Sequence, residues 1–263
     1  MTETEWWGAT NPRTLIDWLF FDANATDRKL RLLSIACAQR VKDHCGDGLF
    51  SAVIDGAEAM ADGLVMGQEF RDIVERGWAL WHQISHTLSH GNRPILQRLS
   101  ACDAVLNCAR PPRRRLREEY QSSHPEIPPE SPYPLEAADE AASVFHLSGP
   151  GGEVPAEMYT ALFAEWGVQS RLLHDIFGPL PFRDVAVAPA WLTSDVLALA
   201  RGIYEEKAFD RLPILADALQ DAGCDNEEVL NHCRAAGWEH VRGCWIVDLL
   251  LGKPWREGDA TPG

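Results

Sequence analysis

The sequence predicts an all-α protein, a multi-helix bundle in which an N-terminal helical region packs on a C-terminal helical bundle. Three observations predict it. Apolar residues recur at the three-to-four-residue spacing of helices along most of the chain, and alternating runs that would indicate strands are nearly absent. Residues that cap helices stand where these periodic stretches begin. Glycine or proline follows where they end.

The N-terminal region, residues 1–120, is expected to consist of consecutive helices. Pro12 suits the first turn of a helix, because a helix leaves its first N–H groups unpaired. Thr26 with Asp27 is a typical helix start, and Gly63 is a typical stop. The expected helices cover residues 12–20, 27–41, 49–62, 67–90 and 95–109.

The middle of the chain changes in composition. Residues 121–134 contain five prolines and keep no apolar period, so they are expected to form a linker or a long loop. The C-terminal helical region is expected from residue 135 to residue 253, followed by a tail over 254–263. Its first helices are expected at residues 135–147 and 155–177, and residues 178–189 are expected to be extended.

The C-terminal bundle is expected to hold four elements. Ser194 is predicted to cap the first, and Asp210 the second, with Pro213 in its first turn. Asp225 and Glu228 resemble a capping box for the third. The last, CWIVDLLLG, is apolar on every side and is therefore expected to be buried, as a helix rather than as a strand. The four elements are expected at residues 194–206, 210–222, 225–234 and 244–252.

Composition and charge narrow the classes of function. The chain has 263 residues and a formal net charge of −15, which repels phosphate backbones and makes nucleic acid an unexpected partner. No apolar run is long enough to span a membrane, and the first residues do not resemble a secretory signal. The cytoplasm is therefore the expected compartment, with no membrane partner. Seven irregularly spaced cysteines favour reduced thiols over a disulfide framework.

Cysteine and histidine gather near the C-terminus, where Cys224, His232, Cys233, His240 and Cys244 fall within 21 positions. The spacing lacks the close cysteine pairs of common zinc motifs. Neighbouring residues on a helix point about 100° apart, so at most one of the adjacent pair joins a ligand set. The candidate zinc ligands are therefore Cys224, Cys233 or its neighbour, His240 and Cys244. The alternative, which the spacing favours, is that these thiols are small buried core residues and that no cofactor binds.

Asp248 lies inside the apolar segment near the C-terminus. A buried carboxylate is costly unless it is paired with a cation or with several hydrogen-bond donors. Arg211 and Arg242 are the nearest candidates along the sequence. We expect a buried polar pair that fixes the register of the helices, and the alternative is an acid or base with a perturbed pKa.

The chain resembles a large paralogous family of uncharacterised bacterial proteins abundant in planctomycetes. The resemblance rests on TDRKLRLLSIACAQRV, LLHDIFGPLPFRDV and above all FDRLPILADALQDAGC followed by HVRGCWIVDLLLGK, and with weaker blocks it covers a little under two thirds of the chain. It implies no cofactor and no catalytic residues. The family's early block resembles FACACCRR, whereas residues 33–40 here read LSIACAQR. The smaller number of thiols argues against a metal site shared with that segment.

No phosphate-binding loop, nucleophile elbow or kinase signature is present. The predicted function is a non-catalytic intracellular interaction or scaffold protein whose protein partner is anchored by Trp6, Trp7 and Trp238. The first alternative is a zinc-stabilised domain that uses the C-terminal cysteines and histidines. The second is an enzyme of unrecognised class that uses Asp248 or the helix face of residues 82, 86 and 90.

Overall fold

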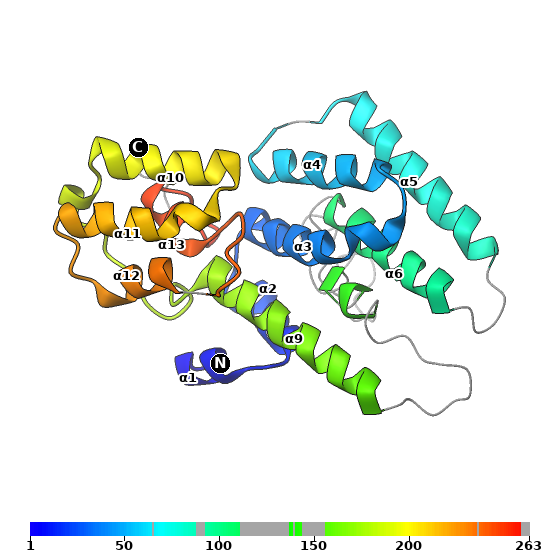
Figure 1. Ribbon diagram of the computed structural model, residues 1–263, viewed down its shortest axis with the longest axis horizontal. Coiled ribbons are helices and arrows are strands. Elements are labelled where there is room, and N and C mark those ends of the chain that lie inside the picture. The colour runs from blue at the N-terminus through cyan, green and yellow to red at the C-terminus, as the bar shows by residue number, and fades with distance from the viewer. Residues whose placement is uncertain are drawn as a thin grey trace.

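A computed structural model describes residues 1–64, 66–87, 93–110, 137–138, 140–143, 156–235 and 237–258, and these residues form helices without a β-sheet. The all-α prediction is confirmed. Figure 1 shows one group of helices on each side of a central helix, and a long helix that runs beneath both groups. None of the described helices is both long and apolar enough to cross a membrane. The predicted linker over 121–134 lies outside the described residues.

The described α-helices follow the predicted order, with the addition of the short first helix, which begins with a capping box from Thr2, and three short 3₁₀ helices are added between them. The N-terminal helices are α1 (Glu3–Gly8), α2 (Pro12–Phe21), α3 (Asp27–Val41), the 3₁₀ helix η1 (Lys42–Cys45), α4 (Leu49–Ala61), α5 (Gln68–His86) and α6 (Arg93–Cys108). The later helices are α9 (Ala156–Phe177), η2 (Pro189–Trp191), α10 (Ser194–Glu206), η3 (Phe209–Arg211), α11 (Leu212–Asp221), α12 (Glu227–Arg234) and α13 (Trp245–Leu250).

Two predicted caps shift by one residue, and a third is absent. Thr193, not Ser194, accepts the hydrogen bond at the start of α10. Asp210 lies inside η3 rather than at the start of a helix, so α11 has no side-chain cap. Asn226, not Asp225, accepts from two backbone amides at the start of α12. At α10 and α12 the capping residue is the one with the extended backbone that a cap requires, which composition alone does not locate.

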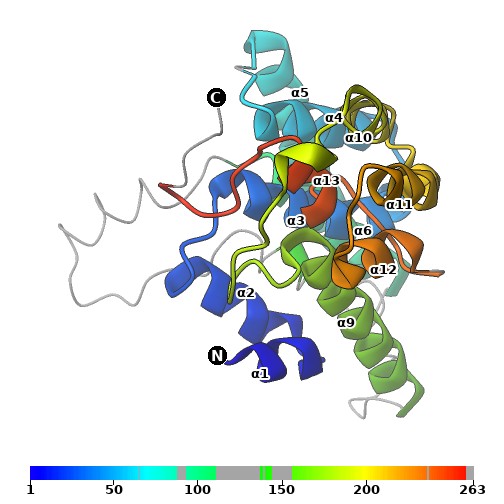
Figure 2. The ribbon, with the colours of Figure 1, turned by 90° about the vertical axis from the view of Figure 1, so that its left-hand side faces the viewer.

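Helix α3 is the centre of the molecule. It packs against α4 and α6 on one side and against α9 on another, and Figure 2 shows α13 lying close to it. Its side chains are buried over most of its length, including the charged Lys29 and Arg31. A helix buried on several faces needs partners for every polar group that it carries into the core.

The buried carboxylate of Asp248 in α13 finds those partners in α3. Arg28 donates to both of its oxygens, at 2.7 and 3.0 Å, and the ammonium of Lys29 lies 2.7 Å from one of them. The side chain of Asp248 is 1% exposed and that of Lys29 is fully buried. The expectation of a paired buried acid is therefore correct.

The prediction that Arg211 and Arg242 pair with Asp248 is wrong. Arg211 pairs with Glu206 at the surface, and Arg242 contacts Glu58 and Asp62 of the α4 region. Both arginines are near Asp248 in sequence, but helix packing brings the cations from more than two hundred positions away.

The end of the described chain returns to the N-terminal helices. Residues 24–26 and 255–257 run antiparallel: Thr26 donates its amide hydrogen to the carbonyl of Trp255 at 2.9 Å, and Glu257 donates to the carbonyl of Asn24 at 3.0 Å. The side chain of Glu257 also accepts from the amide of Asp27 at the start of α3. The helix that carries Arg28 and Lys29 is thus held in place by the last described segment.

Candidate metal centre

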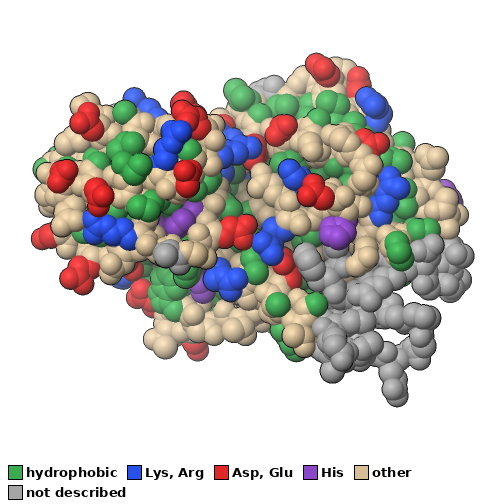
Figure 3. All heavy atoms as spheres, in the orientation of Figure 1, with side chains coloured by type: hydrophobic (Ala, Val, Ile, Leu, Met, Phe, Trp, Pro, Cys, Tyr) green, Lys and Arg blue, Asp and Glu red, His purple; other side chains and the backbone are tan. Residues whose placement is uncertain are grey.

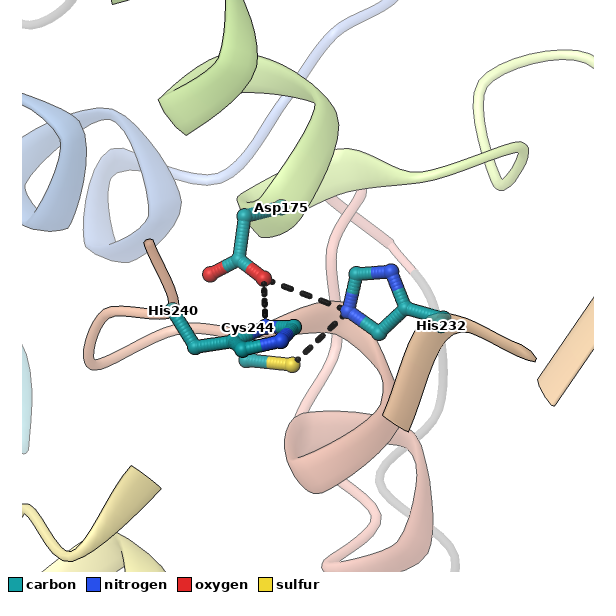
Figure 4. Close-up of side chains that lie close together, drawn as sticks. All are labelled: Asp175, His232, His240 and Cys244. Carbon is teal, nitrogen blue, oxygen red and sulfur yellow. Dashed lines mark hydrogen bonds and ion pairs between the residues drawn. The ribbon is translucent and has the colours of Figure 1, made fainter. Parts of the chain in front are cut away.

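Four polar side chains meet where α9, α12 and the segment before α13 come together (Figure 4). Asp175 comes from the last turn of α9, and His232 from the last turn of α12. His240 lies in the loop after α12, and Cys244 is the residue that precedes α13. One possible ligand atom from each residue lies within 4.8 Å of all the others.

Asp175 is buried in an apolar environment. Its neighbours Leu172, Leu173, Ile176 and Phe177 are all fully buried, and so is Asp175 itself. One carboxylate oxygen accepts the backbone hydrogen of Val241 at 2.9 Å, and this bond orients the carboxylate. The other oxygen lies 2.6 Å from Nδ1 of His240 and 3.2 Å from Nε2 of His232.

Cys244 is held by the turn that leads into α13. Gly243, just before it, has a backbone φ of +98°, and a Cβ there would lie 2.9 Å from the side chain of Leu32. The thiol is fully buried, and its sulfur lies 3.3 Å from Nε2 of His232. Only glycine fits that turn without strain, so the position of the thiol depends on it.

Lys29 links two of these residues to α3. Besides Asp248, its ammonium donates to the carbonyls of Ile176 and Gly243, each at 2.7 Å. These carbonyls belong to the residues that follow Asp175 and precede Cys244. An ammonium has three hydrogens to donate, and here each has an acceptor.

The two distances at His232 are near those of a tetrahedral ion. Zinc binds sulfur at about 2.3 Å and nitrogen or oxygen at about 2.0 to 2.2 Å, so ligand atoms of a tetrahedral site lie roughly 3.3 to 3.8 Å apart. Nε2 of His232 lies 3.3 Å from the sulfur and 3.2 Å from the Asp175 oxygen, close to that range. The 2.6 Å separation of His240 and Asp175 is instead that of a hydrogen bond, and ion binding must lengthen it.

The surroundings shift the pKa values of the two anionic candidates in opposite directions. Burial tends to raise the pKa of Asp175, but hydrogen bonds from His232 and His240 outweigh it, and the pKa is lowered. Burial raises the pKa of Cys244 well above its ordinary value, the nearby Asp175 raises it further, and the backbone amides of Val247 and Ile246 act against this rise. A buried thiol of this kind loses its proton when a cation binds it.

The same residues do not form a thiol–histidine–carboxylate relay. In such a relay the thiol and the carboxylate contact opposite nitrogens of one imidazole. Here both the Cys244 sulfur and the Asp175 oxygen lie beside Nε2 of His232. A nitrogen that faces two other potential metal-ligand atoms is expected around a shared ion. It is not the arrangement of a path for proton transfer.

The cluster contains His240, Cys244 and one member of the adjacent pair from the predicted ligand set. Cys224 and Cys233 are buried outside it. His232 takes the place of its neighbour Cys233, whose pKa burial raises to about 12. Asp175 was missed, although its position in an apolar run is the same signal that drew attention to Asp248.

The three tryptophans predicted to bind a partner differ in exposure. Trp6 is fully buried, where it contacts His174 and Phe177, so its prediction as a surface anchor is wrong. Trp238 is half-buried, and Trp7 is 42% exposed on α1. Adjacent side chains on a helix point about 100° apart, so one of the two tryptophans faces the core and the other faces solvent.

Comparison with family models, with curated proteins and with solved structures finds no match to this chain. The family resemblance stays a prediction. The geometry of the site is therefore the basis on which a function is proposed.

Proposed function

We propose that this protein binds one zinc ion through Asp175, His232, His240 and Cys244, and that the ion is structural. The observation that carries the proposal is the convergence of four ligand atoms of three kinds, thiol, imidazole and carboxylate, within 4.8 Å. Zinc accepts all three kinds, and a tetrahedral site with four protein ligands leaves no open position for a substrate.

Burial supports a structural rather than a catalytic ion. The side chains of Asp175 and Cys244 are fully buried, and those of His240 and His232 are 7% and 12% exposed. A site so closed admits no substrate of ordinary size. The ion would instead join α9, α12 and the start of α13, which pack through few contacts of their own because α12 and α13 are short.

Elemental analysis of the purified protein tests the proposal. We expect about one zinc per chain, and a lower melting temperature after the ion is removed with a chelator. In protein reloaded with cobalt, we expect the visible bands of a tetrahedral ion and a sulfur-to-metal charge-transfer band. Clearly substoichiometric zinc, together with an unchanged melting temperature on chelation, would overturn the proposal.

Matched variants locate the site. Cys244→Ser and His232→Gln are expected to lose the bound ion, and Cys244→Ser also loses the charge-transfer band. Cys233→Ser and His174→Gln are the controls, because each changes a buried side chain of the same type next to a proposed ligand. Retention of the sulfur band in Cys244→Ser would assign the ion to another thiol.

The interaction or scaffold role predicted from composition is a second proposal at the level of the whole protein. Its support is the 42% exposure of Trp7, which packs on the ring of His174 with centroids 4.7 Å apart. Figure 3 shows acidic and basic side chains interspersed over one face of the molecule. A zinc-stabilised bundle is compatible with such a role.

A further inference from the structure

A pocket of about 650 Å³ lies between α3, the end of α4 and the first turns of α5, away from the metal centre. This volume falls within the range of small-molecule sites, roughly 300 to 1,000 Å³. Its walls are mainly apolar, with Leu64, Met66 and Phe70 among them. Leu64 is 62% exposed, which is a large apolar side chain left open to solvent beside an apolar hollow.

The packing of Phe70 makes this wall rigid. A Cβ at Gly56 in α4 would lie only 1.9 Å from the Phe70 ring, so the ring rests directly on the backbone of α4. Phe70 is 8% exposed. An apolar surface that is already in place binds a ligand without the cost of ordering side chains.

The charged groups of the pocket favour an anion. Three guanidinium groups and two carboxylates line it, which leaves one positive charge: Arg28, Arg31 and Arg71 against Asp27 and Glu75. The charge of Arg28 is not fully neutralised by Asp248 either, because that carboxylate also serves Lys29.

Arg71 is the group best placed to receive the anion. It is exposed, and two of its nitrogens donate to the amide oxygen of Gln68 while the third donates to the carbonyl of Met66. Both acceptors are uncharged, and among the described residues no carboxylate forms an ion pair with Arg71. Its guanidinium is therefore held in position by uncharged groups, with no carboxylate bonded to it.

We propose that this pocket binds a small organic carboxylate with an apolar body, its carboxylate at Arg71 and its body against Leu64, Met66 and Phe70. A single surplus positive charge matches a monoanion better than a dianionic phosphate. Guanidinium and carboxylate groups match in shape, since two parallel hydrogen bonds join them. The volume fits a medium-length acyl chain or an aromatic acid rather than a folded partner.

Titration calorimetry with sodium decanoate, below the concentration at which it forms micelles, tests the proposal on the 263-residue chain as purified. We expect saturable binding at one site per chain, and weaker binding of decylamine, which has the same chain with the opposite charge. In Arg71→Gln, the affinity for decanoate should fall about tenfold or more. Leu64→Glu should weaken it as well, since it removes apolar wall and adds a like charge.

Arg211→Gln is the matched control, because Arg211 is exposed and the substitution removes the same charge away from the pocket. Its affinity for decanoate should equal that of the wild type. Three results would overturn the proposal: no saturable binding by the wild type, equal affinity for decanoate and decylamine, or unchanged affinity in Arg71→Gln. None of these results depends on whether zinc occupies the other site.

Discussion

The ammonium of Lys29 in α3 lies 2.7 Å from the carboxylate of Asp248 in α13, and both side chains are closed off from solvent. The same ammonium donates to the backbone carbonyls of Ile176 and Gly243, the residues next to the proposed ligands Asp175 and Cys244. The ion pair therefore joins the N-terminal helices to the C-terminal bundle and also sets the geometry of the candidate metal centre.

Lys29→Met should weaken metal binding as well as folding. Groups that orient metal ligands change metal affinity by roughly 10- to 100-fold when they are removed. Competition with a chromophoric chelator measures the affinity, and the cobalt spectrum reports the geometry. Lys42→Met, at an exposed position, should leave both unchanged. A folded Lys29→Met protein with wild-type affinity would show that the carbonyl contacts do not position the ligands.

Asp248→Asn should destabilise the fold strongly. The substitution leaves the buried Lys29 and the largely buried Arg28 without a counter-charge, and breaking a buried ion pair costs about 3 to 5 kcal/mol. Urea unfolding measures the change. Asp217→Asn removes a surface ion pair with Arg234, in which the Asp217 side chain is 72% exposed. This substitution should lower the free energy of unfolding by less than about 1 kcal/mol. Equal effects in the two variants would contradict the central role of Asp248.

The stability of the wild type should fall in acid partly because of Asp248. Burial acts to raise its pKa, but the charges of Lys29 and Arg28 and their hydrogen bonds outweigh it, so its pKa in the folded state is lowered. Its carboxylate thus contributes stability above its ordinary pKa of about 3.9, and loses it as the pH falls through the lower folded value. Unfolding free energies measured from pH 5 downward should decline less steeply in Asp248→Asn. Parallel profiles would exclude this contribution.

Gly178→Ala should destabilise the end of α9. Gly178 has a φ of +52°, and a Cβ there would lie 2.6 Å from the ring of Trp245. The strain and the clash together should cost about 1 to 3 kcal/mol. Gly202→Ala, within α10 and with open space around it, should instead stabilise the protein by about 0.4 to 1 kcal/mol. Thermal unfolding of both variants gives the two signs, and a neutral Gly178→Ala would mean that Trp245 moves freely.

Trp6→Ala and Trp7→Ala should separate core from surface on one short helix. Trp6 is fully buried, and its loss should cost about 3 to 5 kcal/mol. Trp7 is 42% exposed, so its removal should change the unfolding free energy by much less. Chemical denaturation distinguishes them. A large loss in Trp7→Ala would show that its ring contact with His174 is part of the core.

The helices could be predicted from sequence because their period and their ends are local. Thr26 caps α3 as expected, and the helix ends at Val41 as expected. Helix α1 was missed because six residues show little periodicity, although Thr2 and Glu5 form a capping box that could have revealed it. Asn226 and Thr193 show that neighbouring polar residues compete for a cap, and only backbone geometry decides between them.

The partners of buried charges could not be predicted in the same way. Proximity along the chain favoured Arg211 and Arg242 as partners of Asp248. The cations that neutralise it are Arg28 and Lys29, and Arg28 lies 220 positions away. For the metal centre, cysteine and histidine gather in one stretch of the sequence, and Asp175 lies outside it. Asp175 lies 57 positions before His232, and only the tertiary fold brings the two side chains together.

The antiparallel contact between residues 24–26 and 255–257 has a consequence for synthesis on the ribosome. Helix α3 emerges early, yet its charged residues have no acid to meet until α13 is made, and its first turn is not fastened until the residues after α13 have left the exit tunnel. The nascent chain therefore cannot complete the packing of its central helix until the segment after α13 has been made. Folding then needs a late step that brings two segments far apart in the sequence into contact.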